Sequence, residues 1–210
     1  SSSVSASIDG TTPVTSFSST DTAFAALRSD GSVITWGNSS NGGDGSSVST
    51  SLDGSTPVII ISSTNEAFAA VRSDGSVITW GLSSSGGDSS SVSASIDGTT
   101  PVISISSNNF AFAALRSDGS AITWGFSSNG GDSSSISASL DGSTPVTSIS
   151  STTGAFAAIR SDGSVITWGA DGGDSDSVAN AIDGLNPVVS ISSTDNIFAA
   201  LRLDGTIITW

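Results

Sequence analysis

The chain of 210 residues contains no cysteine, histidine, lysine, methionine or tyrosine. It therefore forms no disulfide, and it lacks ordinary zinc ligands, the base of a Ser-His-Asp triad and any thiol nucleophile. The groups left for proton transfer are carboxylates, mostly aspartates that recur at the same places in repeated turns. A catalytic carboxylate pair needs two different environments in one cleft, which a regular repeat does not provide. We therefore predict that the protein is not an enzyme.

Positive charge is also scarce, because five arginines stand against 19 acidic residues and the net charge is −14. Nucleic acids and anionic membrane surfaces attract basic proteins, so we expect neither as a partner. No apolar stretch reaches the roughly 18 residues that a membrane-spanning helix needs. The chain begins at Ser1 without methionine, which we expect of a processed product or of a part of a longer protein.

Five tryptophans each close the same phrase, Phe-Ala-Ala-x-Arg-x-Asp-Gly-x-x-Ile-Thr-Trp. They end five units and recur every 42 to 44 residues: Trp36, Trp80, Trp124, Trp168 and Trp210. Repeats of this length are typical of propellers, solenoids and open arrays. Residues 1–210 are thus predicted to form a single repeat domain.

Each unit is centred on an Asp-Gly pair between two apolar runs, which predicts a β-hairpin with a two-residue type I′ turn. Counting outward from that turn, Ala25 faces Trp36 and Leu27 faces Ile34. One face of the hairpin then carries these four residues, and the other face is also largely apolar. Apolar residues on both faces are typical of a sheet that lies between two neighbours.

The remainder of each unit predicts a further strand, such as residues 102–106, and one ambiguous segment, such as Val92-Ser-Ala94-Ser-Ile96. Apolar residues at every second position favour a strand or an extended loop there, although a helical turn also fits the spacing. Units of three strands, flanked by like units, favour an all-β fold that is β-propeller-like. An open repeat array or a solenoid is the alternative.

The phrase Phe-Ala-Ala-Leu-Arg-Ser-Asp-Gly-Ser-Val-Ile-Thr-Trp-Gly resembles the repeat of regulator of chromosome condensation propellers. There too, an apolar strand meets an Asp-Gly turn and the next strand ends in Trp-Gly. The segment Thr-Pro-Val matches that family's pattern at residues 12–14, 56–58, 100–102 and 144–146. The resemblance covers all five units and implies a β-propeller. The acidic charge argues against carrying over the family's chromatin role.

The connector that follows each Trp-Gly contains a Gly-Gly-Asp element. Its aspartates are Asp44, Asp88, Asp132 and Asp174. A calcium roll also uses glycine and aspartate, but it needs tandem copies every nine residues. No EF-hand spacing is present either. We favour a tight turn whose aspartate accepts backbone N–H groups, with calcium as the alternative and no other cofactor.

One arginine per unit stands beside the hairpin turn: Arg28, Arg72, Arg116, Arg160 and Arg202. These arginines are predicted to pair with turn aspartates or carbonyl groups, with capture of an anionic ligand as the alternative. The five tryptophans are predicted to pack between units, with a sugar-stacking platform as the alternative.

The copies differ in the loop before the hairpin and at the residue after Trp-Gly. Positions that are free to differ are expected at exposed loops, where binding sites often lie, although neutral drift also produces such variation. Leu82, Phe110 and Phe126 are large apolar residues at these positions and suit a contact with a protein. The candidate contact residues are Asp21, Glu66, Leu82, Asn109, Phe110, Phe126 and Asp195.

These features predict a structural or adhesive interaction scaffold that binds a protein partner or further copies of itself, as a segment of a larger repeat protein or filament. The abundance of serine and threonine and the absence of lysine and cysteine favour an extracellular, cell-surface or virion-surface location. The alternative is a lectin-like propeller that binds a glycan or another ligand in a pocket beside an exposed aromatic residue.

Overall fold

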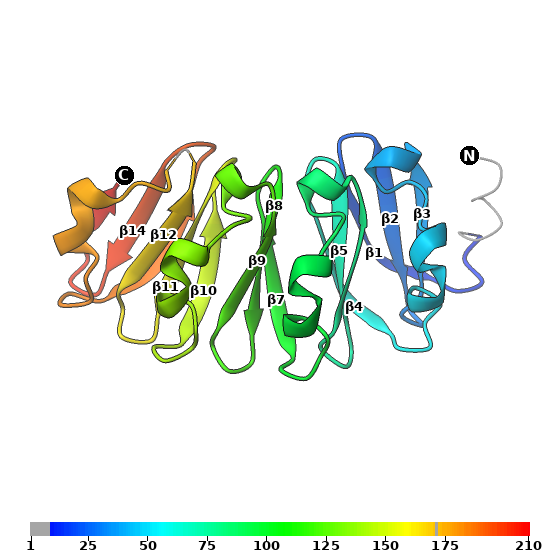
Figure 1. Cartoon of the computed structure of the whole chain (residues 1–210), viewed down its shortest axis with the longest axis horizontal. Coiled ribbons are helices and arrows are strands. Elements are labelled where there is room, and N and C mark those ends of the chain that lie inside the picture. The colour runs from blue at the N-terminus through cyan, green and yellow to red at the C-terminus, as the bar shows by residue number, and fades with distance from the viewer. Residues whose placement is uncertain (1–8, 171) are drawn as a thin grey trace. The chain divides into compact units, whose positions relative to one another are not determined.

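The computed structural model describes residues 9–170 and 172–210, and this part of the chain is built of short strands and short 3-10 helices (Figure 1). The strands form five three-stranded antiparallel sheets, in each of which the order along the chain is also the order in space. We call each sheet a blade. The strands are β1 (Val14–Ser19), β2 (Ala23–Arg28), β3 (Val33–Gly37), β4 (Val58–Ser63), β5 (Ala67–Arg72), β6 (Val77–Gly81), β7 (Val102–Ser107), β8 (Ala111–Arg116), β9 (Ala121–Gly125), β10 (Val146–Ser151), β11 (Ala155–Arg160), β12 (Val165–Gly169), β13 (Val188–Ser193), β14 (Phe198–Arg202) and β15 (Ile207–Thr209).

The chain divides into two compact units, which differ from the repeat units of the sequence. Unit 1 is Ser1–Ile105 and unit 2 is Ser106–Trp210. The boundary between them falls within β7. Unit 1 contains the first two blades, and unit 2 contains the last two blades together with the hairpin β8–β9. The single domain expected over residues 1–210 stays a prediction.

The hairpin of each blade is where the sequence predicts it, but the predicted register is wrong by one residue. Trp36 lies opposite Phe24, and not opposite Ala25, while Ile34 lies opposite Ala26. The reason is the turn, which contains three residues between Arg28 and Ser32 instead of two. The Arg28 N–H donates to the Ser32 carbonyl (2.9 Å), and the Gly31 N–H donates to the Arg28 carbonyl.

The aspartate of the turn has a negative φ, since only glycines have a positive φ among the described residues. This excludes the type I′ turn, which needs a positive φ at both central positions. Instead Asp30 Oδ1 accepts the N–H (2.9 Å) and the hydroxyl (2.6 Å) of Ser32. Gly31, with φ 79°, then returns the chain to the strand in the manner of a three-residue loop with a bulge.

The corrected register separates two different faces on each blade, which we name from the first two blades. The small face carries two alanines and two aliphatic residues, namely Ala23, Ala25, Leu27 and Val33. The aromatic face carries a phenylalanine, an alanine, an isoleucine and the tryptophan, namely Phe68, Ala70, Ile78 and Trp80.

Within unit 1 the core forms where the small face of the first blade packs on the aromatic face of the second. Phe68 and Trp80 are stacked at 5.1 Å between ring centroids and are almost completely buried. In unit 2 the same packing joins the third blade to the fourth and the fourth to the fifth. The predicted apolar faces are therefore present, but the tryptophan shares its face with phenylalanine and not with leucine.

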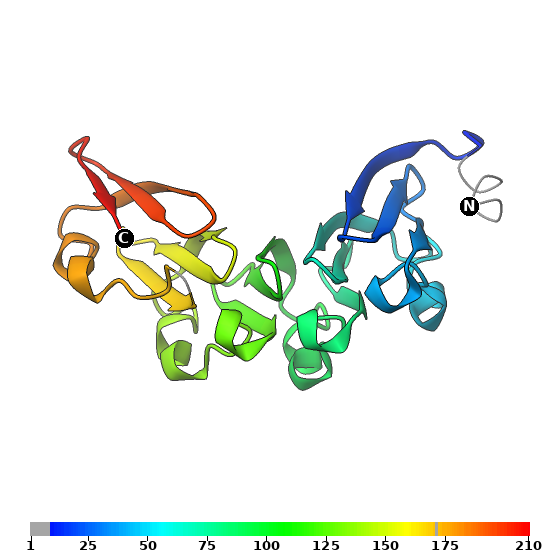
Figure 2. The same ribbon diagram turned by 90° about the horizontal axis from the view of Figure 1, so that it is seen from above.

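The connectors between blades are coils of 3-10 helix (Figure 2). They contain η1 (Ser39–Asn41), η2 (Ser46–Ser51), η3 (Ser83–Ser85), η4 (Ser90–Ser95), η5 (Ser127–Asn129), η6 (Ser134–Ser139) and η7 (Asp176–Ala181). No helix in the described residues is long and apolar enough to cross a membrane.

The segment Val92-Ser-Ala94-Ser-Ile96 was expected to be extended, and this expectation is wrong. In a strand all three apolar side chains would share one face, yet Ala94 is exposed while Ile96 is buried. Instead Ser90–Ser95 form the 3-10 helix η4 and Ile96 is its C-cap, with Val92 half-buried and Ile96 buried. The equivalent residues of the first copy, Val4, Ala6 and Ile8, lie outside the described residues.

In the second to fifth blades the Pro-Val segment closes over the hairpin turn of the blade before it. The Val58 N–H donates to the Gly31 carbonyl (2.9 Å), and the Ser73 N–H donates to the Pro57 carbonyl (2.8 Å). A Cβ atom added to Gly31 would overlap Pro57. The Asp-Gly glycine is thus required twice, for its positive φ and for the close approach of proline.

This arrangement predicts different costs for the same substitution at two hairpin turns. In Gly119→Ala the new Cβ overlaps Pro145, whereas a Cβ at Gly205 has no atom within 4 Å. Both glycines have φ above 80°, so both alanines carry the left-handed backbone cost of about 1–2 kcal/mol. We expect Gly119→Ala to lower the free energy of unfolding by about 1–3 kcal/mol more than Gly205→Ala. Urea unfolding of the two variants measures the difference, and equal losses would contradict the contact with proline.

Candidate interaction surface

The structure brings together the two stretches in which the copies differ. The residue after Trp-Gly donates its N–H to the residue that precedes the hairpin: Leu82 to the Glu66 carbonyl (2.9 Å) and Phe126 to the Phe110 carbonyl (2.9 Å). Asn38 and Ala170 make the same bond to Thr22 and Gly154. We call these paired positions, with the loop residues that precede them, the variable edge of each unit. Variation in two separate stretches of sequence is thus variation of one surface.

In the first four blades a buried polar side chain holds the loop of the variable edge. Thr64 Oγ1 accepts the Ala67 N–H (3.0 Å) and donates to the Ser85 carbonyl (3.0 Å). In the third blade Asn108 makes the equivalent two bonds: its Oδ1 accepts the Ala111 N–H (2.8 Å), and its Nδ2 donates to the Asn129 carbonyl (2.6 Å). Side-chain caps of this kind make the loops a rigid support for whatever residues they present.

Neighbouring loops of the variable edge are also bonded to one another within each unit. The Asp21 N–H donates to the Asn65 carbonyl in unit 1 (2.8 Å). In unit 2 the Asn109 N–H donates to Thr153 (3.2 Å) and the Thr153 N–H donates to Asp195 (2.8 Å). Of the predicted contact residues, Asp21, Asn109 and Asp195 therefore lie in continuous rows of loops.

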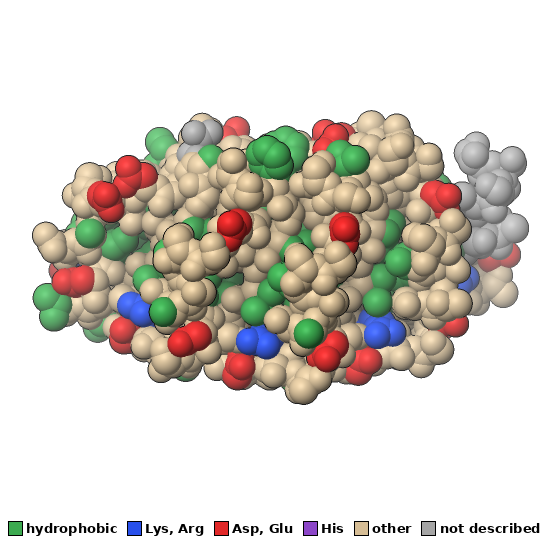
Figure 3. All heavy atoms as spheres, in the orientation of Figure 1, with side chains coloured by type: hydrophobic (Ala, Val, Ile, Leu, Met, Phe, Trp, Pro, Cys, Tyr) green, Lys and Arg blue, Asp and Glu red, His purple; other side chains and the backbone are tan. Residues whose placement is uncertain are grey.

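The third blade gives this edge an aromatic pair. Phe110 and Phe126 meet edge to face, with ring centroids 6.4 Å apart and an interplanar angle of 63°. Phe126 is 48% exposed and Phe110 is half-buried. Apolar side chains stand out at the upper edge of the face shown in Figure 3. A partly exposed aromatic pair on bonded loops has the form of a binding anchor.

Two further large side chains at this edge, Leu82 and Glu66, belong to unit 1, and both are partly covered or bonded to neighbouring residues. Leu82 is half-buried beside Glu66. The Glu66 carboxylate accepts the hydroxyl of Ser85 (2.8 Å), a residue of its own blade's connector. Glu66 therefore supports the loop as well as carrying charge, and the predicted contact residues are unequal in their exposure.

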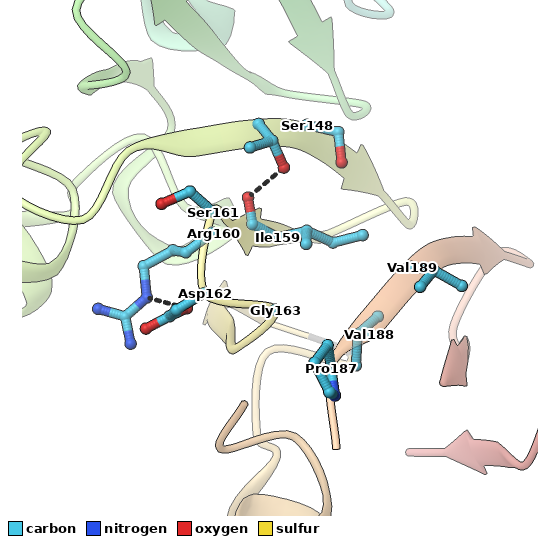
Figure 4. A pocket seen from close by; sticks show the side chains of 10 residues that line it. Ser148, Ile159, Arg160, Ser161, Asp162, Gly163, Pro187, Val188 and Val189 are labelled. Atoms are coloured by element: carbon cyan, nitrogen blue, oxygen red, sulfur yellow. Dashed lines mark hydrogen bonds and ion pairs between the residues drawn. The ribbon is translucent and has the colours of Figure 1, made fainter. Parts of the chain in front are cut away.

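Each arginine beside a hairpin turn is bonded into that turn. Arg160 Nε donates to Ser164 Oγ (2.7 Å) and lies 4.0 Å from Asp162 Oδ1, and the other four arginines make the same bond to the serine or threonine. In Figure 4 the Arg160 guanidinium lies beside Asp162, across the turn from Val188 and Val189. Arginine and aspartate groups are likewise adjacent along the lower edge in Figure 3. Because the turn aspartate already lies beside the guanidinium and offsets its charge, this arrangement favours a structural role of the arginine over capture of an anion.

A shallow depression of about 320 Å³ lies beside this turn, lined among others by Thr147, Arg160, Asp162 and Pro187 (Figure 4). Two hydrogen bonds from Ser164 lower the pKa of Asp162, and the bond from its hydroxyl has a larger effect than the bond from its N–H. The same pair of bonds lowers the pKa of the turn aspartate in the other four blades. The carboxylates therefore stay ionised at neutral pH and serve the turn.

The four aspartates of the Gly-Gly-Asp elements each accept the N–H of the residue two positions on. For Asp88 this donor is Ser90 (2.9 Å), whose N–H and hydroxyl lower the pKa of the carboxyl. Asp44, Asp132 and Asp174 make the same bond. Within residues 9–170 and 172–210 no three acidic side chains come together in a way that could hold a metal ion. Calcium binding at these aspartates stays a hypothesis to be tested.

The first glycine of three Gly-Gly pairs accepts a hydrogen bond from the tryptophan of the next blade. Trp80 Nε1 donates to the Gly42 carbonyl (3.0 Å), and Trp168 and Trp210 make the same bond to Gly130 and Gly172. These three tryptophans thus join a blade to the connector that precedes it. Trp36 is half-buried, whereas Trp80, Trp124 and Trp168 are buried.

Sequence reasoning missed one apolar surface, the aromatic face of the first blade. A groove of about 380 Å³ lies on it, lined by Val14, Phe17, Phe24, Ala26 and Trp36. The missed signal is Phe17, which occupies the position where the other copies have isoleucine. Nothing in a repeat phrase says which copy leaves a face uncovered, so the other residues of this groove carry no sequence signal.

Three-stranded blades that pack face to face and lock through their turns define a β-propeller repeat protein. Its fold is that of the regulator of chromosome condensation type, which confirms the resemblance in the sequence. The human protein WBSCR16 is 16% identical, with a TM-score of 0.61 over 95% of this chain and 62% of that one. Prp20p of Saccharomyces cerevisiae, the yeast RCC1 protein, is 17% identical, with a TM-score of 0.59 over 92% of this chain and 56% of that one.

An extracellular protein shares the fold as well. The ectodomain of the Physcomitrella patens receptor kinase CR4 is 17% identical, with a TM-score of 0.56 over 96% of this chain and 51% of that one. The chain thus spans between half and two thirds of the length of these structures. No protein-family model matches the sequence. No curated protein matches it either.

The lowered pKa values of the turn aspartates predict how stability depends on pH. A carboxyl with a lowered pKa in the folded state stabilises the fold above its unfolded value of 3.8, and this contribution is lost as the pH falls through the folded pKa. Asparagine keeps the oxygen that accepts the serine N–H but does not ionise. We expect replacement of Asp30, Asp74, Asp118, Asp162 and Asp204 by asparagine to lower the free energy of unfolding at pH 6.

The difference between this variant and the unaltered chain is expected to shrink progressively below about pH 4, where the carboxyls of the unaltered chain become protonated. Urea unfolding at a series of pH values measures it. A difference that stays constant down to pH 2 would show that the ionised form contributes nothing to the turns.

The hydrogen bonds of the Gly-Gly-Asp elements predict that calcium does not stabilise the chain. We expect the melting temperature to be unchanged by millimolar calcium, since each carboxylate is occupied by its own turn. Thermal unfolding with calcium and with a chelator measures this. An increase that Asp88→Asn and Asp132→Asn abolish would establish the metal site instead.

Proposed function

We propose that this protein is a non-enzymatic interaction scaffold that binds a protein partner through its variable edge. The observation that carries the proposal is the aromatic pair Phe110 and Phe126, of which Phe126 is exposed and Phe110 half-buried, held on bonded loops. Aromatic side chains at the centre of an interface contribute a large share of binding energy. Loops on a rigid β scaffold are a common place for such residues.

The charge of the chain favours a partner with a basic rim around its apolar contact. The net charge is −14, and Asp21 and Asp195 lie exposed on the loops of the variable edge. Opposite charge around an interface speeds encounter and selects among partners. For Prp20p, binding to Gsp1p and histones is described, and that protein has also been seen bound to Kap60. These examples support protein binding by this fold, as an analogy between folds.

The absence of enzymatic activity is part of the same proposal. The turn aspartates are committed to their own serines or threonines, and the residue types of the common catalytic triads are missing from the sequence. An extracellular or cell-surface location is supported by the composition and by the shared fold of the receptor-kinase ectodomains. An adhesive role would follow from binding at that location.

A library of random peptides displayed on phage tests the binding surface and requires no identified partner. Selection on the full chain is expected to enrich peptides with an apolar or aromatic anchor beside lysine or arginine. Their binding should fall at least tenfold in Phe126→Ser and should weaken as salt is raised. The matched control is Ile103→Ser, which removes a comparably exposed apolar side chain (54%) away from the variable edge.

Enriched peptides that bind Phe126→Ser as well as the unaltered chain would refute the proposed surface. A glycan array run in parallel addresses the lectin-like alternative. Specific glycan binding that depends on an exposed aromatic residue would replace protein binding as the function.

A further inference from the structure

The fifth repeat differs from the other four at two turn positions, where it carries leucine. Leu185 lies in the turn that leads into β13, and Leu203 begins the hairpin turn between β14 and β15. The other copies have serine or threonine there: Thr11, Ser55, Thr99 and Ser143 correspond to Leu185, and Ser29, Ser73, Ser117 and Ser161 correspond to Leu203. Hydroxyl side chains suit turns because they bond to the nearby backbone, and leucine offers no such bond. The two leucines therefore do not serve the turns themselves.

Both leucines are strongly exposed, Leu185 by 91% and Leu203 by 70%. This exposure belongs to their place in the repeat. The serines equivalent to Leu203 are exposed in all of the first four blades, although the next blade covers each of those hairpin turns with a proline. The residues equivalent to Leu185 are exposed as well. A side chain at either position therefore faces solvent even where another blade follows.

Hydrogen bonds hold the two leucines on neighbouring turns. The Leu203 N–H donates to the carbonyl of Pro187, which lies two residues after Leu185 (2.8 Å). The Leu185 N–H donates to Asp183 Oδ1 (2.9 Å). The lead-in turn and the hairpin turn of the fifth blade are thus fixed against each other at the backbone.

A third substitution in the fifth repeat adds to this link. Asn186 stands where the other copies have threonine. The pKa of the Asp204 carboxyl is lowered by hydrogen bonds from the Thr206 hydroxyl and N–H, and also by a hydrogen bond from the Asn186 side chain. A side chain of the lead-in turn therefore reaches the hairpin turn. We call Leu185, Asn186 and Leu203 the leucine patch.

The leucine patch lies at the end of the fifth blade that is opposite to the variable edge. The strands β13, β14 and β15 are antiparallel neighbours in that order. The lead-in to β13 and the β14–β15 turn are therefore at one end of the blade, and the loop between β13 and β14 is at the other. That loop carries Asp195 of the variable edge. The two surfaces are separate.

The charge around the leucine patch is acidic. Asp183 and Asp204 are exposed and lie within two residues of the leucines. Arg202 is the one basic residue of the fifth repeat, and its Nε is bonded to Thr206 Oγ1 (2.7 Å). A second copy of the chain would bring the same carboxylates to the contact, and an anionic membrane surface would be repelled. Lysine or arginine on a partner would be attracted instead.

We propose that the leucine patch is a second docking surface, which binds a protein segment with an apolar side chain between lysine or arginine residues. The apolar side chain lies against Leu185 and Leu203, and the basic residues lie beside Asp183 and Asp204. The contact is independent of the variable edge. A chain with both surfaces binds two protein segments at once, at opposite ends of its blades.

A library of random peptides displayed on phage tests the patch when the selection uses the Phe126→Ser variant, which lacks the aromatic anchor of the variable edge. We expect enrichment of peptides with an apolar residue between lysine or arginine. Fluorescence anisotropy of one enriched synthetic peptide then measures its affinity. Leu185→Ser and Leu203→Ser together are expected to weaken binding by about tenfold or more, and raised salt should weaken it further.

The two serine substitutions restore residues that other copies carry, so the turns are expected to stay intact, and circular dichroism checks this. The matched control is Ile103→Ser, which removes an exposed apolar side chain (54%) elsewhere and should leave peptide binding unchanged. The unaltered chain should bind the peptide as tightly as Phe126→Ser does.

A transfer of the patch to the fourth blade tests whether its three residues are sufficient. The Ser161 N–H donates to the Pro145 carbonyl (2.7 Å), as the Leu203 N–H does to Pro187. Adding Ser143→Leu, Thr144→Asn and Ser161→Leu to the variant without the two leucines should therefore restore peptide binding.

Three results would overturn the proposal. The first is a selection in which no enriched peptide depends on the two leucines. The second is a transfer that leaves binding lost. The third is an increase of mass with concentration in analytical ultracentrifugation that the two serine substitutions abolish, since it would assign the patch to a second copy of the chain. None of these results bears on the variable edge, because the selection is made without Phe126.

Discussion

The fit of an aromatic face on a small face is the contact on which the rest of the molecule depends. Phe68 and Trp80 stack on each other and fill the space that Ala23 and Ala25 leave open on the preceding blade. Larger residues in place of these alanines would hold the blades apart, and smaller residues in place of the aromatic pair would leave a cavity. The alternation of alanine with larger residues in each second strand follows directly from this requirement.

The same contact separates the positions that must repeat from those that are free to vary. The turn glycine, the following proline and the capping threonine or asparagine each serve the approach of one blade to the next or the shape of a loop. Phe110 and Phe126 lie outside these constraints, at an edge where any side chain can be presented. A rigid interior of identical parts therefore supports an edge that differs from copy to copy.

Much of this fold could be predicted from the period of the tryptophans and from the Asp-Gly pairs, which place every hairpin correctly. The register could not, because an Asp-Gly pair fits a loop of two residues or of three, and the bond from Arg28 to Ser32 decides between them only once the side chains are placed. The segment around Ala94 failed for a related reason. A spacing that fits both a strand and a helical turn is decided by which residues find a core.

The sequence by itself determined the repeat, the all-β class, the acidic surface and the missing catalytic groups, because these depend on residue types and their spacing. Only the tertiary structure decided which residues meet. It paired Phe110 with Phe126 across 16 positions of chain, and it left Phe17 and Phe24 exposed while burying Phe68 and Phe156 in nearly the same phrase. The burial of a side chain is set by the neighbour that covers it, and a repeated phrase is silent about whether that neighbour is present.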